Sequence, residues 1–406
     1  MAGDTTIGEF CPFSYGKGLP EHSRNPKGRI AVYGSNGIVG RHDTALTQGP
    51  AVVVGRKGTV GAVHLCLEPC WPIDTTFYIE FSDKIEARFT YYLLKTLGLE
   101  HMNSDSAVPG LNRAAAHARA ITVPDEASRA AIACILGTLD DKIDLNRRMN
   151  ERLEAMARAI FKSWFVDFHP VRAKAEGREP GLPKHIADLF PDEFEESGLD
   201  HIPKGWRLGA IGDLAHINAR MLGPNDSLDV IDYIEISEVM RGDVATITRY
   251  RRGEEPSRAR RRLQHGDTVL STVRPDRGAY FLCIDPAETL IASTGFAVLT
   301  PRDGNWAFVH AAATRAEVGQ ELGRLADGGA YPAVRPDVVA ARVAVIPDDA
   351  RLVSTFDEIA EPLFLRAASN RRDHGTLASI RDALLPKLIS GELPIRDVDR
   401  FAGRCA

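Results

Sequence analysis

No stretch of the 406-residue sequence approaches the roughly 18 consecutive apolar residues that a membrane span needs. The first residues, Met-Ala-Gly-Asp-Thr-Thr, lack the basic segment and apolar stretch of a secretory signal, which favours a cytoplasmic protein. Only six cysteines are present and none forms a C-x-x-C pair. We therefore expect reduced thiols, and neither a disulfide framework nor a zinc site.

The sequence also lacks an excess of positive charge. Its 50 Lys and Arg residues against 55 Asp and Glu residues give a formal net charge of −5. Any surface for nucleic acid must therefore be local, or be shared with a partner. What the sequence does contain is 44% hydrophobic residues, which is enough for two or three domains with buried cores and excludes a disordered or fibrous chain.

Motifs for catalysis are missing as well. Residues 55–61 (GRKGTVG) lack the Gly-Lys-Ser/Thr end of a P-loop, and residues 34–40 (GSNGIVG) lack the dinucleotide-binding spacing, so tight β-turns explain these glycines. We find no Pro-Pro-aromatic methylation motif, no nuclease cluster, and no metal-ligand spacing among the 12 histidines. Asp140 and Asp141 fall on what we expect to be an exposed helix face. We predict that the chain is not an enzyme and has no catalytic residue, metal site or cofactor of its own.

The sequence instead contains an internal repeat. The triplet 146–148 (NRR) returns as 370–372, an offset of 224, and 123–125 (VPD) returns as 346–348 (IPD), an offset of 223. Further upstream, 61–66 (GAVHLC) resembles 278–283 (GAYFLC) at an offset of 217. Near the two starts, 7–10 (IGEF) resembles 211–214 (IGDL) at an offset of 204. Offsets that drift in one direction are typical of a duplicated unit with insertions in its loops.

Each copy of the repeat ends in a predicted long helix, at about 125–168 and 348–390. Apolar residues recur every seven positions, with one Asn among them: Ile132, Leu139, Asn146, Leu153 and Ile160, then Phe356, Leu363, Asn370, Leu377 and Leu384. This pattern favours a coiled coil, and a polar residue at the seam fixes its register. We expect Asn146 and Asn370 to meet at the middle of an antiparallel pair. Two ordinary core helices in separate domains are the alternative.

The parts before the helices are predicted to be mixed α+β domains, because short β-branched or aromatic runs alternate with glycine turns. The expected organisation is a first domain (1–123), a first long helix (124–168), a linker with a short helix (169–204), a second domain (205–346), a second long helix (347–392) and a tail (393–406).

Side chains suited to binding DNA gather in or beside the glycine turns. Arg can contact guanine through two hydrogen bonds, Lys suits phosphate, and Ser, Thr and Asn can contact bases or backbone. Seven arginines and only two glutamates also occupy 249–262, a candidate phosphate-binding run. Solvated loop charge is the alternative for each residue. The candidate contacts are Lys17, Ser35, Asn36, Arg41, Arg56, Lys57, Thr59, Arg251, Arg252, Arg260, Arg261, Arg274 and Arg277.

Several segments together resemble a known family, the specificity subunits of type I restriction–modification systems. In the first half these are YGSNGIVG (33–40), GRKGTVG (55–61), WPIDTTFY (71–78), PGLNRAAAHARAITVP (109–124) and the long helix with its extension (139–174). In the second half they are IPKGWRLGAIGDL (202–214) and LLPKLISGEL (384–393). The resemblance covers nearly the whole chain and is weakest in the second recognition module.

The resemblance implies two DNA-recognition domains with pseudo-two-fold symmetry, separated by an antiparallel coiled coil. Each domain would read half of a split double-stranded DNA target, and the helices would set the spacer. Two adenine-N6 methyltransferase subunits that bind S-adenosylmethionine would dock on the chain. A motor-nuclease subunit that uses ATP and Mg could join them. Only six residues precede Ile7, so an edge strand of the first domain could be missing or abbreviated.

Two other functions remain open at this point. The chain could be the DNA-recognition subunit of a restriction architecture in which methylase and nuclease are fused. It could also be a coiled-coil scaffold that does not bind DNA. The genes beside this one would identify the first, and co-purification with a methyltransferase would exclude the second.

Overall fold

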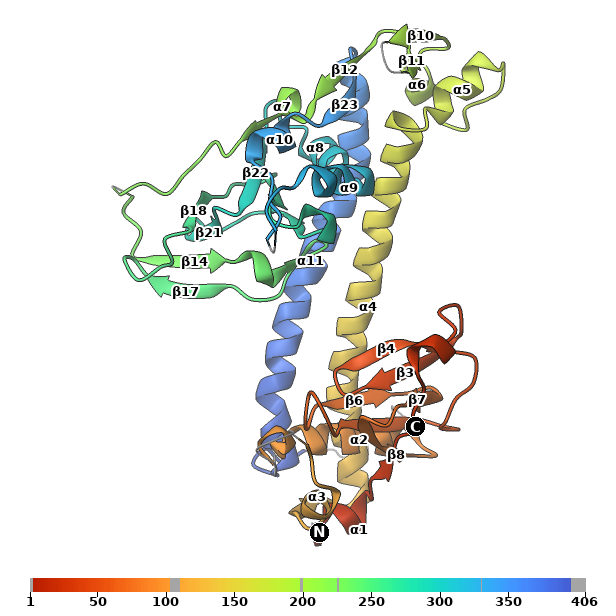
Figure 1. Cartoon of the computed structure of the whole chain (residues 1–406), viewed down its shortest axis with the longest axis vertical. Coiled ribbons are helices and arrows are strands. Elements are labelled where there is room, and N and C mark those ends of the chain that lie inside the picture. The colour runs from red at the N-terminus through yellow and green to blue at the C-terminus, as the bar shows by residue number, and fades with distance from the viewer. Residues whose placement is uncertain (1–2, 103–109, 198–199, 225, 330, 396–406) are drawn as a thin grey trace. The chain divides into compact units, whose positions relative to one another are not determined.

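The computed structural model describes residues 3–102, 110–197, 200–224, 226–329 and 331–395. The chain forms two compact units, one of residues 1–146 with 372–406 and one of residues 147–371 (Figure 1). The boundary passes through both copies of the repeated NRR triplet. Each unit therefore contains one globular domain and about half of each long helix.

The two long helices are α4 (Glu126–Phe165) and α11 (Ala350–Ile389), each of 40 residues and inside its predicted range. Both begin behind an aspartate that accepts a backbone hydrogen bond from the first turn. Asp125 accepts from Ser128 at 3.0 Å, and Asp349 accepts from Arg351 at 3.0 Å. These side chains satisfy backbone groups that would lack a partner at a helix start.

The helices run antiparallel within each unit. In the first unit Arg381 forms an ion pair with Asp140 at 2.7 Å, and Ile132 shares an apolar cluster with Leu388. In the second unit, Asn370 Nδ2 donates to Asn150 Oδ1 at 2.8 Å, and the rings of Phe161 and Phe356 lie 5.6 Å apart. In both units the partner number on α11 falls as the number on α4 rises. The predicted antiparallel helix pair is confirmed.

The first unit carries a globular domain with three sheets. A four-stranded antiparallel sheet has the order β2-β8-β5-β6, and a second sheet has the order β4-β3-β7, with β3 and β7 parallel. Strand β1 pairs with β9. The strands are β1 (Gly3–Thr6), β2 (Ser14–Tyr15), β3 (Ile30–Gly34), β4 (Gly37–His42), β5 (Ala51–Gly55), β6 (Val63–Cys66), β7 (Cys70–Pro72), β8 (Thr76–Glu80) and β9 (Ala120–Val123). The helices are α1 (Ile7–Phe10), η1 (Glu21–Ser23), α2 (Lys84–Lys95), η2 (Leu99–His101) and α3 (Arg113–His117).

The second unit has a four-stranded sheet with the same pairing, while its other large sheet has one strand more and β15 pairs with β16. Its sheets have the orders β13-β22-β19-β20 and β17-β14-β21-β18, again with one parallel pair, β14 and β21. Strand β12 pairs with β23 as β1 does with β9. The strands are β12 (Trp206–Ala210), β13 (Ala215–Ile217), β14 (Val230–Ile234), β15 (Val239–Met240), β16 (Asp243–Val244), β17 (Thr248–Arg251), β18 (Ala259–Arg262), β19 (Thr268–Ser271), β20 (Tyr280–Leu282), β21 (Leu290–Ser293), β22 (Phe296–Pro301) and β23 (Val343–Pro347). The helices are α7 (Ile211–Leu214), η3 (Ile236–Glu238), η4 (Pro275–Arg277), α8 (Trp306–Ala313), α9 (Ala316–Leu325) and α10 (Pro336–Ala340).

Two sequence-based expectations need correction, on the linker and on the cysteines, and a third can now be decided. The segment 169–204 is more than a linker, because α5 (His169–Ala175), α6 (Lys184–Ala187) and the hairpin β10–β11 (Phe194–Ser197, Asp200–Pro203) form there, and Val171 and Phe190 join an aromatic core. The edge strand of the first domain, which was expected to be missing or abbreviated, is present as β1 and is one residue shorter than β12. Cys11, Cys66, Cys70 and Cys283 are buried free thiols, but Cys134 is disulfide-bonded.

Asp140 and Asp141 on α4 were expected to lie on an exposed helix face, but both bind residues of the first domain. Asp140 accepts a hydrogen bond from the Tyr92 hydroxyl and pairs with Arg381, and Asp141 pairs with Arg88 at 2.6 Å. Tyr92 and Arg88 belong to α2, so both aspartates attach the first domain to α4. Among the described residues, no helix is long and apolar enough to cross a membrane.

The second domain is attached to its helix by a different polar contact. The carboxylate of Asp357 on α11 accepts hydrogen bonds from the backbone N–H groups of Phe308 at 2.9 Å and Ala307 at 3.2 Å. These groups lie in the first turn of α8, whose own N-cap residue, Asn305, makes no side-chain cap. Burial raises the pKa of Asp357 to about 7, and the two N–H donors oppose that rise.

We predict that Asp357→Ala loosens α8, because two buried N–H groups lose their acceptor. The expected loss is about 1–2 kcal/mol of local stability, measured as faster amide hydrogen exchange in α8. The neighbouring Glu358 is exposed, and Glu358→Ala is the matched control. Equal exchange in the two variants would show that the contact does not hold the domain to its helix.

Candidate nucleic-acid interface

The basic turn of the first domain follows β5. The backbone N–H groups of Arg56 and Lys57 both donate to the Thr75 carbonyl, at 2.9 and 3.1 Å, and Gly61 N–H closes the turn on Gly55 at 2.8 Å. Gly61 has a φ of 73°, and a side chain there would collide with the backbone of Glu100. The turn is therefore fixed by its backbone, while the Lys57 and Thr59 side chains remain exposed.

An exposed aromatic ring holds Arg56. The Arg56 Cζ atom lies 5.0 Å from the ring centroid of Tyr15, and Arg56 Nη1 donates to the Asp74 carbonyl at 3.3 Å. A second cation, Arg113, lies 4.7 Å from the same ring. Arg113 was not among the candidates predicted from the sequence. Arg113 lies within the family-like segment 109–124, but Tyr15, the residue whose ring it contacts, is far from it in the sequence.

The other candidates of the first domain differ in exposure. Ser35 is buried and its hydroxyl donates to the Thr75 carbonyl at 2.6 Å, so it supports the turn. Asn36 is exposed in the turn between β3 and β4, and Arg41 is exposed on β4. Lys17 is exposed, with its Nζ atom 6.0 Å from the ring centroid of Trp71. Three of these four side chains are thus placed to meet a ligand.

The second domain has a basic turn at the matching place, between β19 and β20. Arg274 adopts a left-handed conformation with a φ of 46°, and its N–H donates to the Pro332 carbonyl at 2.8 Å. The Arg274 Cζ atom lies 5.3 Å from the ring centroid of Tyr331. Arg277 is exposed at the end of the same turn. A non-glycine residue held at positive φ is often found at a functional site.

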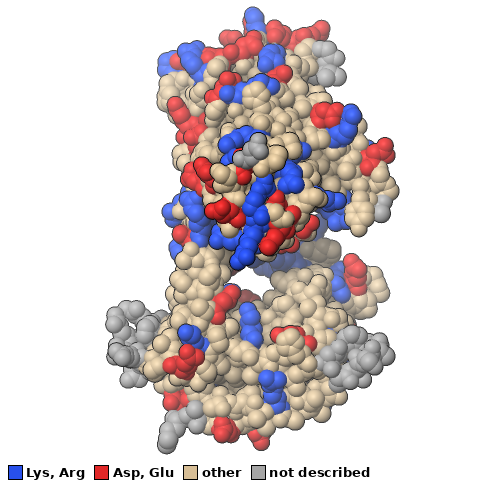
Figure 2. All heavy atoms as spheres, turned by 90° about the vertical axis from the view of Figure 1, so that its left-hand side faces the viewer, with Lys and Arg blue, Asp and Glu red and all other residues tan. Residues whose placement is uncertain are grey.

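The arginine run 249–262 is largely neutralised by acids of its own domain. Arg252 pairs with Glu255 at 2.6 Å, and Arg260 approaches the same carboxylate at 3.5 Å. Arg249 pairs with Asp232, and Arg262 with Asp226, each at 2.8 Å. Figure 2 shows acidic side chains interspersed among the basic ones. The run therefore offers less free charge to phosphate than the sequence implies.

Two candidates of the run remain. Arg251 is exposed and forms no ion pair with any residue that the structure describes. Arg261 is half-buried, and its Nε atom has no hydrogen-bond partner in the described part of the chain. Burial lowers the pKa of Arg261. Arg251 is the better placed of the two for an external partner.

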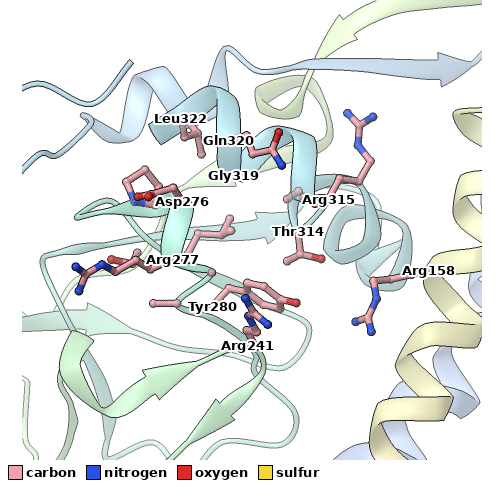
Figure 3. A pocket seen from close by; sticks show the side chains of 17 residues that line it. Arg158, Arg241, Asp276, Arg277, Tyr280, Thr314, Arg315, Gly319, Gln320 and Leu322 are labelled. Carbon is pink, nitrogen blue, oxygen red and sulfur yellow. The ribbon is translucent and has the colours of Figure 1, made fainter. Parts of the chain in front are cut away.

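A cavity of about 420 Å³ lies beside the second basic turn. Arg158, Arg241, Arg277 and Arg315 all line it, with Tyr280 between them. Figure 3 shows that the four guanidinium groups point in different directions and do not converge. Arg315 already donates to the Ala312 and Val343 carbonyls, at 3.2 and 3.3 Å. The four arginines therefore cannot bind one anion together in this cavity.

The two seam asparagines are both buried. Asn370 has Asn150 as a partner, one helical turn after Asn146 on α4. Asn146 and Asn370 belong to different units, so their direct contact remains a prediction.

Residues 3–155 match the family model described as the type I restriction modification DNA specificity domain. Two curated relatives extend the likeness. The specificity subunit of the type I restriction enzyme HindI from Haemophilus influenzae is 23% identical over 347 residues, covering 67% of this chain and 69% of the relative. The specificity subunit of the type I restriction enzyme MjaIX from Methanocaldococcus jannaschii is 22% identical over 360 residues, covering 86% and 78%.

A solved structure shares the fold. The crystal structure of a type I restriction–modification S subunit from M. genitalium matches with a TM-score of 0.59 at 15% identity, covering 96% of each chain. Residues 3–155 thus match a type I restriction modification DNA specificity domain, and both curated relatives are specificity subunits of type I restriction enzymes. The chain is similar to this class of protein over most of its length.

We predict that Glu255 is needed to hold the arginine run together. Its side chain is only 5% exposed and forms ion pairs with both Arg252 and Arg260. Glu255→Ala would leave two cations without their acceptor, and should cost about 1–3 kcal/mol of local stability, read from hydrogen exchange in β18. The adjacent Glu254 is exposed, so Glu254→Ala is the control. Unchanged exchange in both variants would contradict the role given to Glu255.

Proposed function

We propose that the chain is the DNA sequence-specificity subunit of a type I restriction–modification complex, and that each globular domain reads one half of a bipartite target. One observation carries the proposal. A four-stranded sheet with the same pairing occurs in both units, and in both the turn after the equivalent strand, β5 or β19, presents an arginine beside an exposed tyrosine. Because the two domains share a sheet but differ in the residues of the basic turn, each could bind a different half-site in a similar way.

The antiparallel helices suit a role as a spacer. In this proposal α4 and α11 fix the distance between the half-sites and dock two adenine-N6 methyltransferase subunits, which bind S-adenosylmethionine. A motor-nuclease subunit that uses ATP and Mg completes a restriction complex. The chain itself contributes recognition and no catalysis, and it acts in the cytoplasm. The near-neutral charge of the chain fits a complex in which partners supply much of the phosphate contact.

Methylation-sensitive sequencing of the host genome, with and without this gene, tests the function. We expect one bipartite adenine-methylated sequence to disappear when the gene is removed, and to return with the intact gene. Purified chain alone should transfer no methyl group. An unchanged methylation pattern, or methyl transfer by the rigorously purified chain, would exclude the proposal.

We predict that the two basic turns provide DNA contacts, with Arg56 and Lys57 at the first half-site and Arg274 and Arg277 at the second. An Arg→Ala change at a base contact should cost about 1–3 kcal/mol and relax one position, whereas a lost phosphate contact weakens all sequences and lowers the salt dependence. The measurement is the affinity of the methyltransferase complex for DNA at two salt concentrations.

The strongest test replaces Arg56, Lys57, Arg274 and Arg277 together with Ala. Its control replaces four exposed basic residues that already form ion pairs, namely Lys84, Arg178, Lys184 and Arg351. This control loses the same charge away from the turns. If the turn variant binds DNA as the wild type does, or no worse than the control, the turns are not the DNA contacts.

We predict that the seam asparagines give register at the expense of stability. Replacing Asn146 and Asn370 with Leu should raise the melting temperature but allow methylation of targets with altered spacers. Asn150 would lose its amide partner, so a triple variant with Asn150→Leu separates that effect. Strict spacer selection in both variants would show that the asparagines do not set the register.

A further inference from the structure

The exposed ring of Tyr15 carries two arginines. Tyr15 is 49% exposed, and the Arg56 and Arg113 Cζ atoms lie 5.0 and 4.7 Å from its centroid. Beneath it lies Phe77, which is buried, with the two ring centroids 5.1 Å apart. The tyrosine ring therefore has a fixed support on its inner side, while Arg113 is exposed and Arg56 is half-buried beside it.

The positive charge on this ring is not balanced locally. Neither Arg56 nor Arg113 forms an ion pair with any residue in the described ranges. Two like charges on one ring repel each other within about one Debye length of 10 Å, and cation–π attraction at an exposed ring only partly offsets that repulsion. An acceptor-rich ligand would stabilise the pair.

The second domain holds its arginine in the same way with unrelated residues. Arg274 lies over Tyr331, a ring that is 76% exposed. Tyr15 belongs to β2, whereas Tyr331 precedes α10, so the two tyrosines do not occupy equivalent positions. In the second domain the hydrogen bond from Arg274 N–H to the Pro332 carbonyl joins the turn to the tyrosine loop. In each domain the arginine of the basic turn thus lies beside an exposed tyrosine, but the two tyrosines come from different parts of the domain.

We propose that Tyr15 and Tyr331 are positioning residues that present Arg56 and Arg274 to guanine edges of the DNA target, and that Arg113 is a second guanine-reading arginine of the first domain. This inference rests on the proposed function. Guanine offers O6 and N7 as two acceptors in the major groove, and the planar guanidinium matches them with two donors. A guanidinium already stacked on a ring loses less freedom when it makes these bonds.

The test uses the complete methyltransferase complex and the target that genome sequencing defines. Each guanine of the first half-site is replaced in turn by 7-deazaguanine, which lacks the N7 acceptor. We expect a loss of about 5- to 150-fold in wild-type affinity at the guanines that Arg56 and Arg113 read. Arg113→Ala should bind natural and 7-deaza DNA equally at its own guanine, while other guanines keep their effect.

Variants of the ring separate positioning from packing. Tyr15→Phe keeps the aromatic face and should keep the guanine preference, while Tyr15→Leu keeps an apolar residue and should lose it. Tyr91 on α2 also carries a cation, Lys95, at 5.3 Å, so Tyr91→Leu is a matched control that should leave the preference unchanged. In the second half-site, Tyr331→Phe and Tyr331→Leu should differ in the same way.

Three results would overturn the inference. The first is equal behaviour of Tyr15→Phe and Tyr15→Leu. The second is a 7-deazaguanine effect that persists unchanged at every guanine of the first half-site in Arg113→Ala. The third is a uniform loss of affinity in Arg113→Ala with a smaller salt dependence, which would mark a phosphate contact. If the wild-type complex has a defined target but the arginine variants keep its guanine preference, this inference alone is wrong. If the wild-type complex shows no sequence preference at all, the proposed function is wrong too.

Discussion

The antiparallel packing of α4 against α11 is the constraint on which the rest of the structure depends. An isolated helix of 40 residues gains little stability from propensity alone, and most of its stability comes from burying one face. Apolar contacts supply that burial in each unit, while Asp140–Arg381 in the first unit and Asn150–Asn370 in the second fix which residues face each other. A slip by one turn would separate these polar partners and bury groups without acceptors.

Each globular domain is built onto this helix pair by contacts that differ in kind. The first domain uses α2, through Tyr92 and Arg88, to reach two aspartates on α4. The second uses the first turn of α8, which Asp357 of α11 caps. The aromatic core around Phe165, Phe308 and Phe356 adds a large apolar contact in the second unit. The two domains share the pairing of one four-stranded sheet and one parallel strand pair, whereas their attachments and turn residues differ.

Local patterns made much of this fold predictable. The heptads located α4 and α11 within three residues at each end, and the repeat anticipated matching strands such as β6 and β20. Long-range contacts were not predictable from one sequence. Nothing near Asp140 indicates that its partners are Tyr92 and Arg381, and nothing near residues 169–204 indicates that they complete an aromatic core built by other segments.

The same limit applies to the candidate interface. Glycines at 55, 58 and 61 located the first basic turn correctly, since turn chemistry is local. The run 249–262 was overestimated because its neutralising acids, Asp226 and Asp232, come from other strands and loops. Arg113 was missed because only the fold brings it to Tyr15.

The central claim is that each domain reads its own half-site through one shared architecture. The most direct measurement is the DNA sequence methylated in cells that express a hybrid chain, in which a copy of the first domain replaces residues 205–346, together with the methyltransferase subunits that we propose as partners. The account predicts a symmetric target made of two inverted copies of the first half-site, with the spacer nearly unchanged. Retention of the original second half-site in that sequence would contradict it.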